Sequence, residues 1–338
     1  MKVIVDAMGG DHAPVQVMKG CALAVKEYGI EVILCGKRDI IEQTAIQENI
    51  DMTGMSVADA PQVIEMTDHA DSVVKDKKDS SMAVGMRLLK AGEGDAFISA
   101  GNTGAVITGA TLLVKRMKGV KRAAIGGMIP SIGGKKHLLI DSGANVECSA
   151  EYLHQFAVMG SMYMTCMFGM ESPRVGLLNN GTEDTKGTPL QIEANERLRQ
   201  ETRINFIGNV EARDGVMGQA DVVVADGFSG NIYLKALEGM GKMISTSLKS
   251  VLFKNLRTKI GTLLIAKEFT QFKKSFDYTE AGGAPLLGVS GIVIKAHGSS
   301  NDMAIKNAIR QAIELHQAGI IEKLTQMMAP TPKADNCL

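Results

Sequence analysis

The sequence predicts an α/β fold in which helices cover both faces of a mostly parallel β-sheet. Short apolar runs rich in β-branched residues alternate with segments of helical spacing along nearly the whole chain, as in parallel strands joined by helices. Several of these runs end in a small polar turn; Val222–Ala225, for example, leads into Asp226-Gly-Phe-Ser-Gly-Asn231. Such a turn at a helix start presents free backbone N–H groups and the positive end of the helix, which together favour anions.

Strands and helices are expected in alternation from the first residues onward. Apolar, β-branched runs predict strands at Lys2–Asp6, Glu31–Cys35, Ser56–Ala60, Ala96–Ser99, Ala123–Ile129, Lys136–Ile140, Val175–Leu178, Asn205–Asn209, Asp221–Ala225 and Ile292–Lys295. Apolar residues at helical spacing predict helices at Val15–Tyr28, Asp39–Gln47, Ser80–Ala91, Val106–Lys115, Ala150–Phe168, Leu190–Gln200, Ile232–Phe276 and Asn301–Gly319. Pro14 fits a first helical turn, Gly29 ends that helix, and Ser80 or Ser81 caps a later one. The glycine-rich stretch Gly283–Gly288 predicts a loop.

The length of 338 residues exceeds the size that one hydrophobic core usually serves. We expect one large α/β domain over residues 1–330, or two intimately joined subdomains. A helical hairpin is expected as an insertion at 232–276, and residues 331–338 are expected to form a loose tail. The formal net charge is zero, which gives no indication of nucleic-acid binding.

The cysteines and the chain start indicate the compartment. The five cysteines are an odd number without a Cys-x-x-Cys pair, which fits reduced thiols in a cytosol. The first residues begin a strand rather than a signal peptide. No apolar run approaches the roughly 20 residues that a membrane-spanning helix needs. We therefore expect a cytoplasmic protein whose contact with a membrane is at most peripheral.

Five polar turns follow expected strands and supply the first candidates for a binding site. Ligands of open parallel sheets bind at the carboxyl ends of the strands, so we expect the five turns to meet at one edge as a polar cleft. The candidate residues are Asp11 and His12, then Asn102, Thr103 and Gly104, then Asp141 and Asn145, then Asn180, Gly181, Thr182, Glu183 and Lys186, and last Asp226, Gly227, Ser229 and Asn231.

The ligand expected in this cleft is a plain phosphate group. The dinucleotide fingerprint Gly-x-Gly-x-x-Gly is absent, and no Gly-Lys pair is followed by the Ser or Thr of a P-loop. Short Gly, Asn and Thr turns still offer N–H donors to a phosphate. Asp141, Glu183 and Asp226 are oxygen ligands of the kind that Mg²⁺ uses, whereas the absence of His-Glu-x-x-His and of paired histidines disfavours zinc. We expect neither a cofactor nor a resident metal.

Three residues near the expected cleft are candidates for chemistry. Lys186 lies in a loop rich in donors, where a lysine neutralises a phosphate or a developing oxyanion; a solvated loop lysine is the alternative. His297 follows an expected strand, where it either contacts an anion and moves a proton or simply begins a helix. Cys148 is close to the cleft, but a free cysteine is usually a small buried hydrophobe. No Gly-x-Ser-x-Gly elbow occurs, which disfavours a serine hydrolase.

Six motifs, in order over nearly the whole chain, relate the sequence to a known family. They are Asp6-Ala-Met-Gly-Gly-Asp-His-Ala-Pro14, Ser99-Ala-Gly-Asn-Thr-Gly-Ala105, Asp141-Ser-Gly-Ala-Asn145, Gly176-Leu-Leu-Asn-Asn-Gly181, Asp226-Gly-Phe-Ser-Gly-Asn231 and Gly282-Gly-Ala-Pro-Leu-Leu-Gly288. With this ordered set the chain resembles the bacterial phosphate acyltransferase family, the PlsX type. The resemblance implies transfer of a fatty acyl group from acyl carrier protein to inorganic phosphate, which yields acyl phosphate for phospholipid synthesis.

The same resemblance implies structural properties. The expected fold is a three-layer α/β/α sandwich like those of isopropylmalate dehydrogenase and phosphotransacetylase, with the helical hairpin protruding from it. A homodimer is implied, and so are catalytic roles for Lys186 and Asn231. The glycerol-3-phosphate acyltransferase that acts downstream is a further expected partner.

The chemistry of such a transfer agrees with the residues. Phosphate itself attacks the thioester, so the protein only has to hold an anion against the carbonyl and stabilise the oxyanion that forms. We assign phosphate binding to the turns Asn102–Gly104 and Gly181–Thr182. Lys186 and Asn231 are expected to act on phosphate or on the tetrahedral intermediate, with His297 beside them.

A basic segment from Lys242 to Phe276 lies outside this cleft. It holds eight Lys or Arg and one acid, so it carries +7 while the rest of the chain carries −7. Apolar residues recur every four positions, and Gly261 with Thr262 is the expected turn of a helical hairpin. Such a pair contacts an anionic membrane, docks the acidic acyl carrier protein, or forms a dimer interface. The residues expected on this surface are Leu252, Leu256, Arg257, Ile260 and Leu264.

Three other functions are open at this point. A short-chain phosphate acyltransferase that uses acyl-CoA shares the cleft but does not need the basic hairpin. A metal- and nicotinamide-dependent hydroxyacid dehydrogenase shares the fold but needs metal carboxylates and a cofactor site. A non-catalytic membrane scaffold explains the hairpin yet leaves the polar turns without a role.

Overall fold

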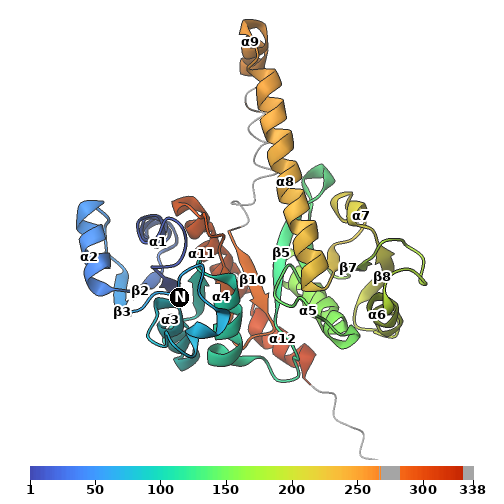
Figure 1. The fold of residues 1–338 in the computed structure, drawn as a ribbon, viewed down its shortest axis with the longest axis horizontal. Coiled ribbons are helices and arrows are strands. Elements are labelled where there is room, and N and C mark those ends of the chain that lie inside the picture. The colour runs from blue at the N-terminus through green and yellow to red at the C-terminus, as the bar shows by residue number, and fades with distance from the viewer. Residues whose placement is uncertain (266, 268–281, 330–338) are drawn as a thin grey trace, which may run out of the picture.

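The computed structural model describes residues 1–265, 267 and 282–329, and one eleven-stranded sheet runs through it (Figure 1). The strands follow one another across the sheet in the order β3-β2-β1-β4-β11-β10-β5-β6-β9-β7-β8. Their bounds are β1 (Lys2–Asp6), β2 (Glu31–Gly36), β3 (Met55–Asp59), β4 (Ala96–Ser99), β5 (Ala124–Pro130), β6 (Lys136–Ile140), β7 (Arg174–Leu178), β8 (Asn205–Val210), β9 (Val222–Val224), β10 (Ala284–Leu287) and β11 (Ile292–Lys295).

Strand directions divide the sheet into two parallel groups. β3, β2, β1, β4 and β11 run parallel to one another, and so do β6, β9, β7 and β8. Between the groups, β10 pairs antiparallel with β11 and with β5, and β5 pairs antiparallel with β6. These three successive reversals leave the two parallel groups running in opposite directions across the centre of the sheet.

Helices cover both faces and complete a three-layer sandwich. Their bounds are α1 (Val15–Tyr28), α2 (Arg38–Gln47), α3 (Ser81–Ala91), α4 (Thr103–Gly109), α5 (Ala150–Phe168), α6 (Pro189–Arg199), α7 (Ala212–Val216), α8 (Gly227–Leu252), α9 (Leu256–Leu264), α11 (Asp302–Gln317) and α12 (Ile320–Met328), with short helical turns at η1 (Ala70–Val73), η2 (Ala110–Lys115) and η3 (Ile132–Gly134). Alternate strand residues serve the two faces, as period-two geometry requires. Val3 and Val5 belong to the core cluster that α1, α5, α6, α11 and α12 cover, whereas Ile4 belongs to the cluster that α3 and α4 cover. Leu139 and Val223 pack with α7 and α8.

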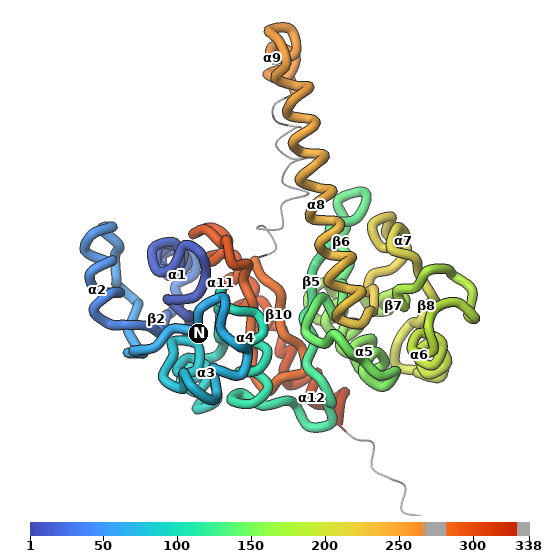
Figure 2. The backbone as a smooth tube through the Cα atoms, in the orientation of Figure 1, coloured from blue at the N-terminus to red at the C-terminus, as the bar shows by residue number. Residues whose placement is uncertain are grey.

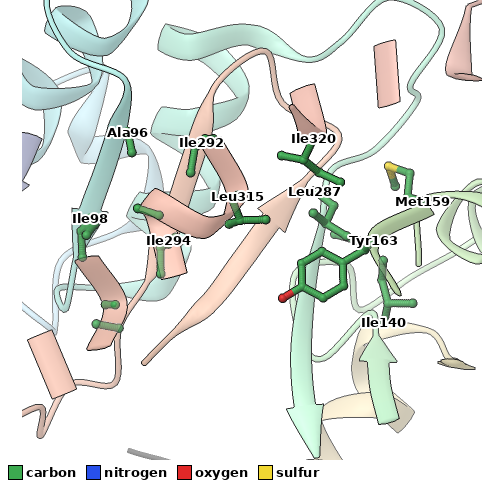
Figure 3. Close-up of a cluster of buried hydrophobic side chains, with 14 of the residues drawn as sticks. Ala96, Ile98, Ile140, Met159, Tyr163, Leu287, Ile292, Ile294, Leu315 and Ile320 are labelled. Carbon is green, nitrogen blue, oxygen red and sulfur yellow. The ribbon is translucent and has the colours of Figure 1, made fainter. Parts of the chain in front are cut away.

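The largest core cluster joins the two strand groups through the centre of the sheet (Figure 3). The buried side chains drawn there include Ala96 and Ile98 of β4, Ile292 and Ile294 of β11, Leu287 of β10, Ile140 of β6, Met159 and Tyr163 of α5, Leu315 of α11 and Ile320 of α12. The antiparallel strands therefore belong to the same hydrophobic core as the parallel groups.

The predicted end of α1 and the predicted cap of α3 are both confirmed. Gly29 ends α1 in the left-handed conformation, at φ 62°. Ser80 caps α3 by accepting a hydrogen bond from the Ala83 N–H.

Two expectations about the sheet are wrong. Gly283–Gly288 is not a loop, because Ala284–Leu287 forms β10 between β11 and β5. Pro285 and the flanking glycines are unfavourable in a central strand, which is why the sequence pattern missed it. The polar turns do not share one edge of the sheet, because β10 and β5 reverse the strand direction between them.

The long helical segment differs from its predicted limits. It begins at Gly227 rather than Ile232, because the Asp226 side chain caps α8. The end of α8 stands out from the body and carries α9 (Figures 1 and 2). Among the described residues, none of the helices is both long enough and apolar enough to cross a bilayer.

The turn between α8 and α9 is also displaced from the predicted position. Gly261 and Thr262 lie within α9, so the expectation of a turn there is wrong. Asn255 starts α9 by accepting a hydrogen bond from the Thr258 N–H at 3.0 Å, and the Thr262 hydroxyl donates to the Leu252 carbonyl at 3.1 Å. Residues 266 and 268–276 of the predicted hairpin, and the predicted tail at 331–338, lie outside the described residues.

A buried histidine connects α8 to the β5–β6 hairpin. His137 is fully buried; its Nδ1 lies 2.8 Å from Ser131 Oγ and its Nε2 lies 3.5 Å from the Tyr233 hydroxyl. The Ser131 hydroxyl in turn donates to the Gly215 carbonyl at 3.1 Å. Burial lowers the pKa of His137 to about 4, although the negative charge of Asp221 raises it in part.

We predict that His137 makes the protein less stable as the pH falls from about 6.5 to 4. The unfolded chain takes up a proton at a histidine pKa near 6.5, whereas the folded chain does so only near 4. The loss is about 3 kcal/mol of unfolding free energy over this range. Urea unfolding of the native protein and of His137→Gln at several pH values measures it. An equally steep fall in the variant would contradict the assignment.

Candidate active site

The first group of polar loops follows β1, β4 and β11, which are neighbours in the sheet. It comprises residues 7–14, 100–104 and 296–301. The Asp11 N–H donates to the Gly298 carbonyl at 2.8 Å, which joins the first and third loops. Asp11, His12, Thr103 and His297 are exposed on this group.

Two buried charges, Asp6 and Lys295, lie at the strand ends from which these loops start. The Ser99 hydroxyl donates to the Asp6 carboxylate at 2.7 Å, and the Lys295 ammonium group donates to the Ala100 carbonyl at 3.3 Å. Burial lowers the pKa of Lys295 to about 8, although the charges of Asp6 and Asp11 raise it in part. The two side chains hold the strand ends together and partly compensate each other's buried charge.

His297 lies at the surface of the first loop group. Its Nδ1 is 2.8 Å from Ser299 Oγ. Burial by the neighbouring loops lowers the pKa of His297, and the positive charge of Lys235 on α8 lowers it further, whereas Glu238 and Asp11 raise it in part. The imidazole is therefore mostly neutral at pH 7 and is suited to accepting or passing on a proton.

The second group of loops follows β6, β9 and β7, which are likewise neighbours. Its centre is the fully buried carboxylate of Asp141. This carboxylate accepts hydrogen bonds from the backbone N–H groups of Ile125, Gly143, Ala144 and Asn145, and from the Asn145 side-chain amide. The nest of donors in this loop is thus filled by the protein's own anion, so these N–H groups are not open to a ligand.

The start of α8 packs directly on this loop. The Gly227 N–H donates to the Asn145 carbonyl at 2.7 Å, and the Asp226 side chain caps the helix by accepting from the Ser229 N–H at 2.8 Å. A Cβ atom on Gly230 would lie 2.0 Å from the Asp141 carbonyl oxygen, so only glycine permits the contact. Asn231, the next residue, is exposed beside Gly143.

Lys186 lies in the loop between β7 and α6. Its side chain packs over Gly181, and its carbonyl accepts a hydrogen bond from the Asn179 amide at 3.1 Å. The Asn209 side chain anchors the same loop through the Glu183 carbonyl at 2.8 Å. Because β7 and β9 are neighbours, the loops that carry Lys186 and Asn231 lie at the same edge of the sheet.

Helix α8 connects the two loop groups, although they follow strands of opposite direction. Asn231, Lys235 and Glu238 recur at helical spacing, so they share one face of α8. Tyr233 lies on the opposite face, buried against the sheet. The positive charge of Lys235 lowers the pKa of His297 in the first loop group, and the negative charge of Glu238 raises it in part.

Comparison with known proteins assigns the chain. Residues 1–323 match the family model described as fatty acid synthesis protein. A phosphate acyltransferase of Clostridium novyi is 45% identical over 96% of this chain and 97% of its own length. Another, from Caldanaerobacter subterraneus, is 47% identical over 93% of each chain. The chain belongs to the phosphate acyltransferase family.

Solved structures of low sequence identity show the same fold. A phosphotransacetylase from Streptococcus pyogenes is 18% identical, with a TM-score of 0.62 over 95% of this chain and 94% of its own. The EutD phosphotransacetylase from Staphylococcus aureus, also 18% identical, gives a TM-score of 0.60 over 94% of both chains. The predicted three-layer sandwich of phosphotransacetylase type is thereby confirmed.

In this phosphate acyltransferase family member, the predicted site residues fall into two classes. Some have their polar side chains committed to the fold: Asn102 caps α4 and holds the loop at 65–68, Asn145 binds Asp141, and Asp226 caps α8. The exposed candidates are Asp11, His12, Thr103, Asn180, Thr182, Glu183, Lys186, Asn231 and His297. Gly104, Gly181, Gly227 and Ser229 are buried or half-buried backbone positions beside them.

Three residues of the site were missed from the sequence. Asp6 and Lys295 ended predicted strands, and only their burial side by side sets them apart. Lys235 looked like an ordinary charge on a basic helix, although its spacing from Asn231 was a usable signal.

The Cys148 thiol is not activated as a nucleophile. Burial raises the pKa of the Cys148 thiol to about 12, so it is protonated at neutral pH and a poor nucleophile. Within the described ranges, no cluster of three or more His, Cys, Asp or Glu is arranged to hold a metal ion.

We predict that Gly230→Ala lowers the unfolding free energy by roughly 1–3 kcal/mol, because the methyl group meets the Asp141 carbonyl and displaces α8. Gly239→Ala is the matched control on the same helix: nothing lies within 4 Å of the added Cβ, so this variant should gain roughly 0.5–1 kcal/mol. Urea unfolding of both variants measures the difference. A Gly230→Ala protein as stable as Gly239→Ala would disprove the contact.

Proposed function

We propose that this phosphate acyltransferase transfers a fatty acyl group from acyl carrier protein to inorganic phosphate. The observation that supports it most directly is the placement of two exposed residues after the neighbouring strands β7 and β9: Lys186 in the loop that follows β7, and Asn231 in the first turns of α8, which follows β9. An exposed cation beside the N-terminus of a long helix suits a phosphate anion.

The proposed reaction needs no enzyme nucleophile. An oxygen of hydrogen phosphate forms a bond to the thioester carbonyl carbon, and a tetrahedral oxyanion results. The carbon–sulfur bond then breaks, and the proton of the phosphate passes to the departing sulfur. The products are acyl phosphate, as a dianion, and the free thiol of the carrier protein, so charge and atoms balance.

Each exposed residue has a proposed part in this reaction. Lys186 neutralises the phosphate and the developing oxyanion. The Asn231 amide donates to the oxyanion, from a helix turn held firmly against the Asp141 loop. His297, being mostly neutral, carries the proton from phosphate to sulfur. Asp11, His12, Thr103 and Thr182 are proposed to orient the phosphate.

We predict that Lys186→Ala and Asn231→Ala each lower kcat roughly a hundredfold, as loss of one oxyanion or phosphate contact does elsewhere. The assay mixes acyl carrier protein thioester with phosphate and traps the acyl phosphate with hydroxylamine. Lys90→Ala, an exposed lysine at the end of α3, is the control and should keep normal turnover. Near-normal turnover in both site variants would remove these roles.

The outlying end of α8 and α9 is the proposed contact with an anionic membrane surface. Leu256, Leu263 and Leu264 are 74%, 76% and 82% exposed, and Ile260 and Arg257 are exposed beside them. Apolar side chains flanked by lysine and arginine favour an anionic bilayer surface. Leu252 is only half-buried at the end of α8. The proposal places the protein in the cytoplasm as a homodimer with peripheral membrane contact, near the enzyme that consumes acyl phosphate.

We predict that changing Leu256 and Ile260 to Glu abolishes flotation with vesicles of phosphatidylglycerol and phosphatidylcholine, because two carboxylates cannot enter the apolar layer. Leu112→Glu is the control and should float normally, because it changes an exposed leucine of η2, which is distant from α9 in the chain. Light scattering checks the oligomeric state of each variant. Unchanged flotation would refute membrane contact, and a loss of oligomers would instead assign this surface to self-association.

A further inference from the structure

One of the two negative charges of the phosphate is not neutralised by the residues that the proposed reaction uses. Hydrogen phosphate carries two negative charges near neutral pH, and Lys186 supplies one positive charge. His297 is mostly neutral at that pH. Lys295 is largely buried, and its ammonium group already donates to the carbonyls of Ala100 and Ala296. A second cation with a free approach to an anion is therefore needed from elsewhere.

Lys235 meets this need. Its side chain is 55% exposed and lies one helical turn beyond Asn231 on the same face of α8. Its ammonium nitrogen is 2.7 Å from the carboxylate of Glu238, which holds the lysine in place on the helix surface. Its positive charge lowers the pKa of both His297 and Lys295.

We propose that Lys235 is a further phosphate-binding residue, held by Glu238 on the Asn231 face of α8 opposite the His297 loop. This inference rests on the proposed function. Phosphate that binds between α8 and the first loop group draws the ammonium group away from Glu238, an exposed pair of modest strength. The Lys235–phosphate contact replaces that pair with a charge-assisted hydrogen bond to a doubly charged anion.

The proposal explains how the two loop groups act on one anion. Lys186 and Asn231 belong to loops that follow strands of one direction, whereas His297 and Asp11 belong to loops that follow strands of the other. Lys235 is on the helix that starts in the second group, and its charge acts on His297 in the first. A phosphate bound to Lys235 is therefore subject to the charges of both loop groups.

The test compares substitutions with opposite expected effects. Lys235→Ala should raise the KM for phosphate about tenfold, as loss of a charge-assisted hydrogen bond does, and leave the KM for the acyl thioester nearly unchanged. Lys235→Arg should restore most of the phosphate affinity. Glu238→Gln, which releases the lysine, should lower the KM for phosphate. Lys90→Ala, the exposed lysine at the end of α3 and outside both loop groups, is the control and should match the native protein.

A second measurement is independent of turnover. Inorganic phosphate alone should raise the melting temperature of the native protein and of Lys90→Ala, and raise that of Lys235→Ala far less. Equal phosphate-dependent shifts in Lys235→Ala and the native protein, or equal rises in both KM values, would overturn the assignment. If the native protein binds phosphate but makes no acyl phosphate, the proposed function fails while the binding role of Lys235 is still measured.

Discussion

The contact between Gly230 of α8 and the backbone of Asp141 determines how the site is built. A side chain at position 230 would overlap the Asp141 carbonyl oxygen, so α8 approaches the β6 loop as closely as two backbones allow. The Asp141 carboxylate holds the same loop rigid with hydrogen bonds from its own backbone. Asn231 is therefore presented from a fixed position, which is what stabilising a short-lived oxyanion requires.

Buried polar groups stabilise both loop groups in the same way. In each group a carboxylate at the end of a strand, Asp6 or Asp141, accepts hydrogen bonds from a neighbouring strand and from the loop that follows it. These contacts occupy the side chains at the base of the loops, whereas Lys186 and His297 lie exposed at the surface. Polar residues of similar type therefore stabilise the fold at one position and belong to the candidate site at the next.

The two ends of helix α8 carry different functional residues. Its first turns carry Asn231, Lys235 and Glu238, and its far end carries α9 and the exposed leucines. At about 1.5 Å per residue, its 26 residues span about 39 Å. Under the proposed function, a water-insoluble product forms near one end of this helix while the other end contacts the membrane that receives it.

The sequence by itself determined the alternation of strands and helices, the three-layer sandwich, the Gly29 and Ser80 helix limits, and the polar turns from which Lys186, Asn231 and His297 come. These depend on short windows of the chain, namely periodicity, caps and turn chemistry. The tertiary structure alone decided that Ala284–Leu287 is a strand, that the loops form two groups, and that Asn102 and Asn145 are committed to the fold. It also decided that the charge of Lys235 acts on His297, more than 60 residues away in the chain. Strand direction and side-chain partners depend on contacts between residues far apart in the chain, which no local pattern records.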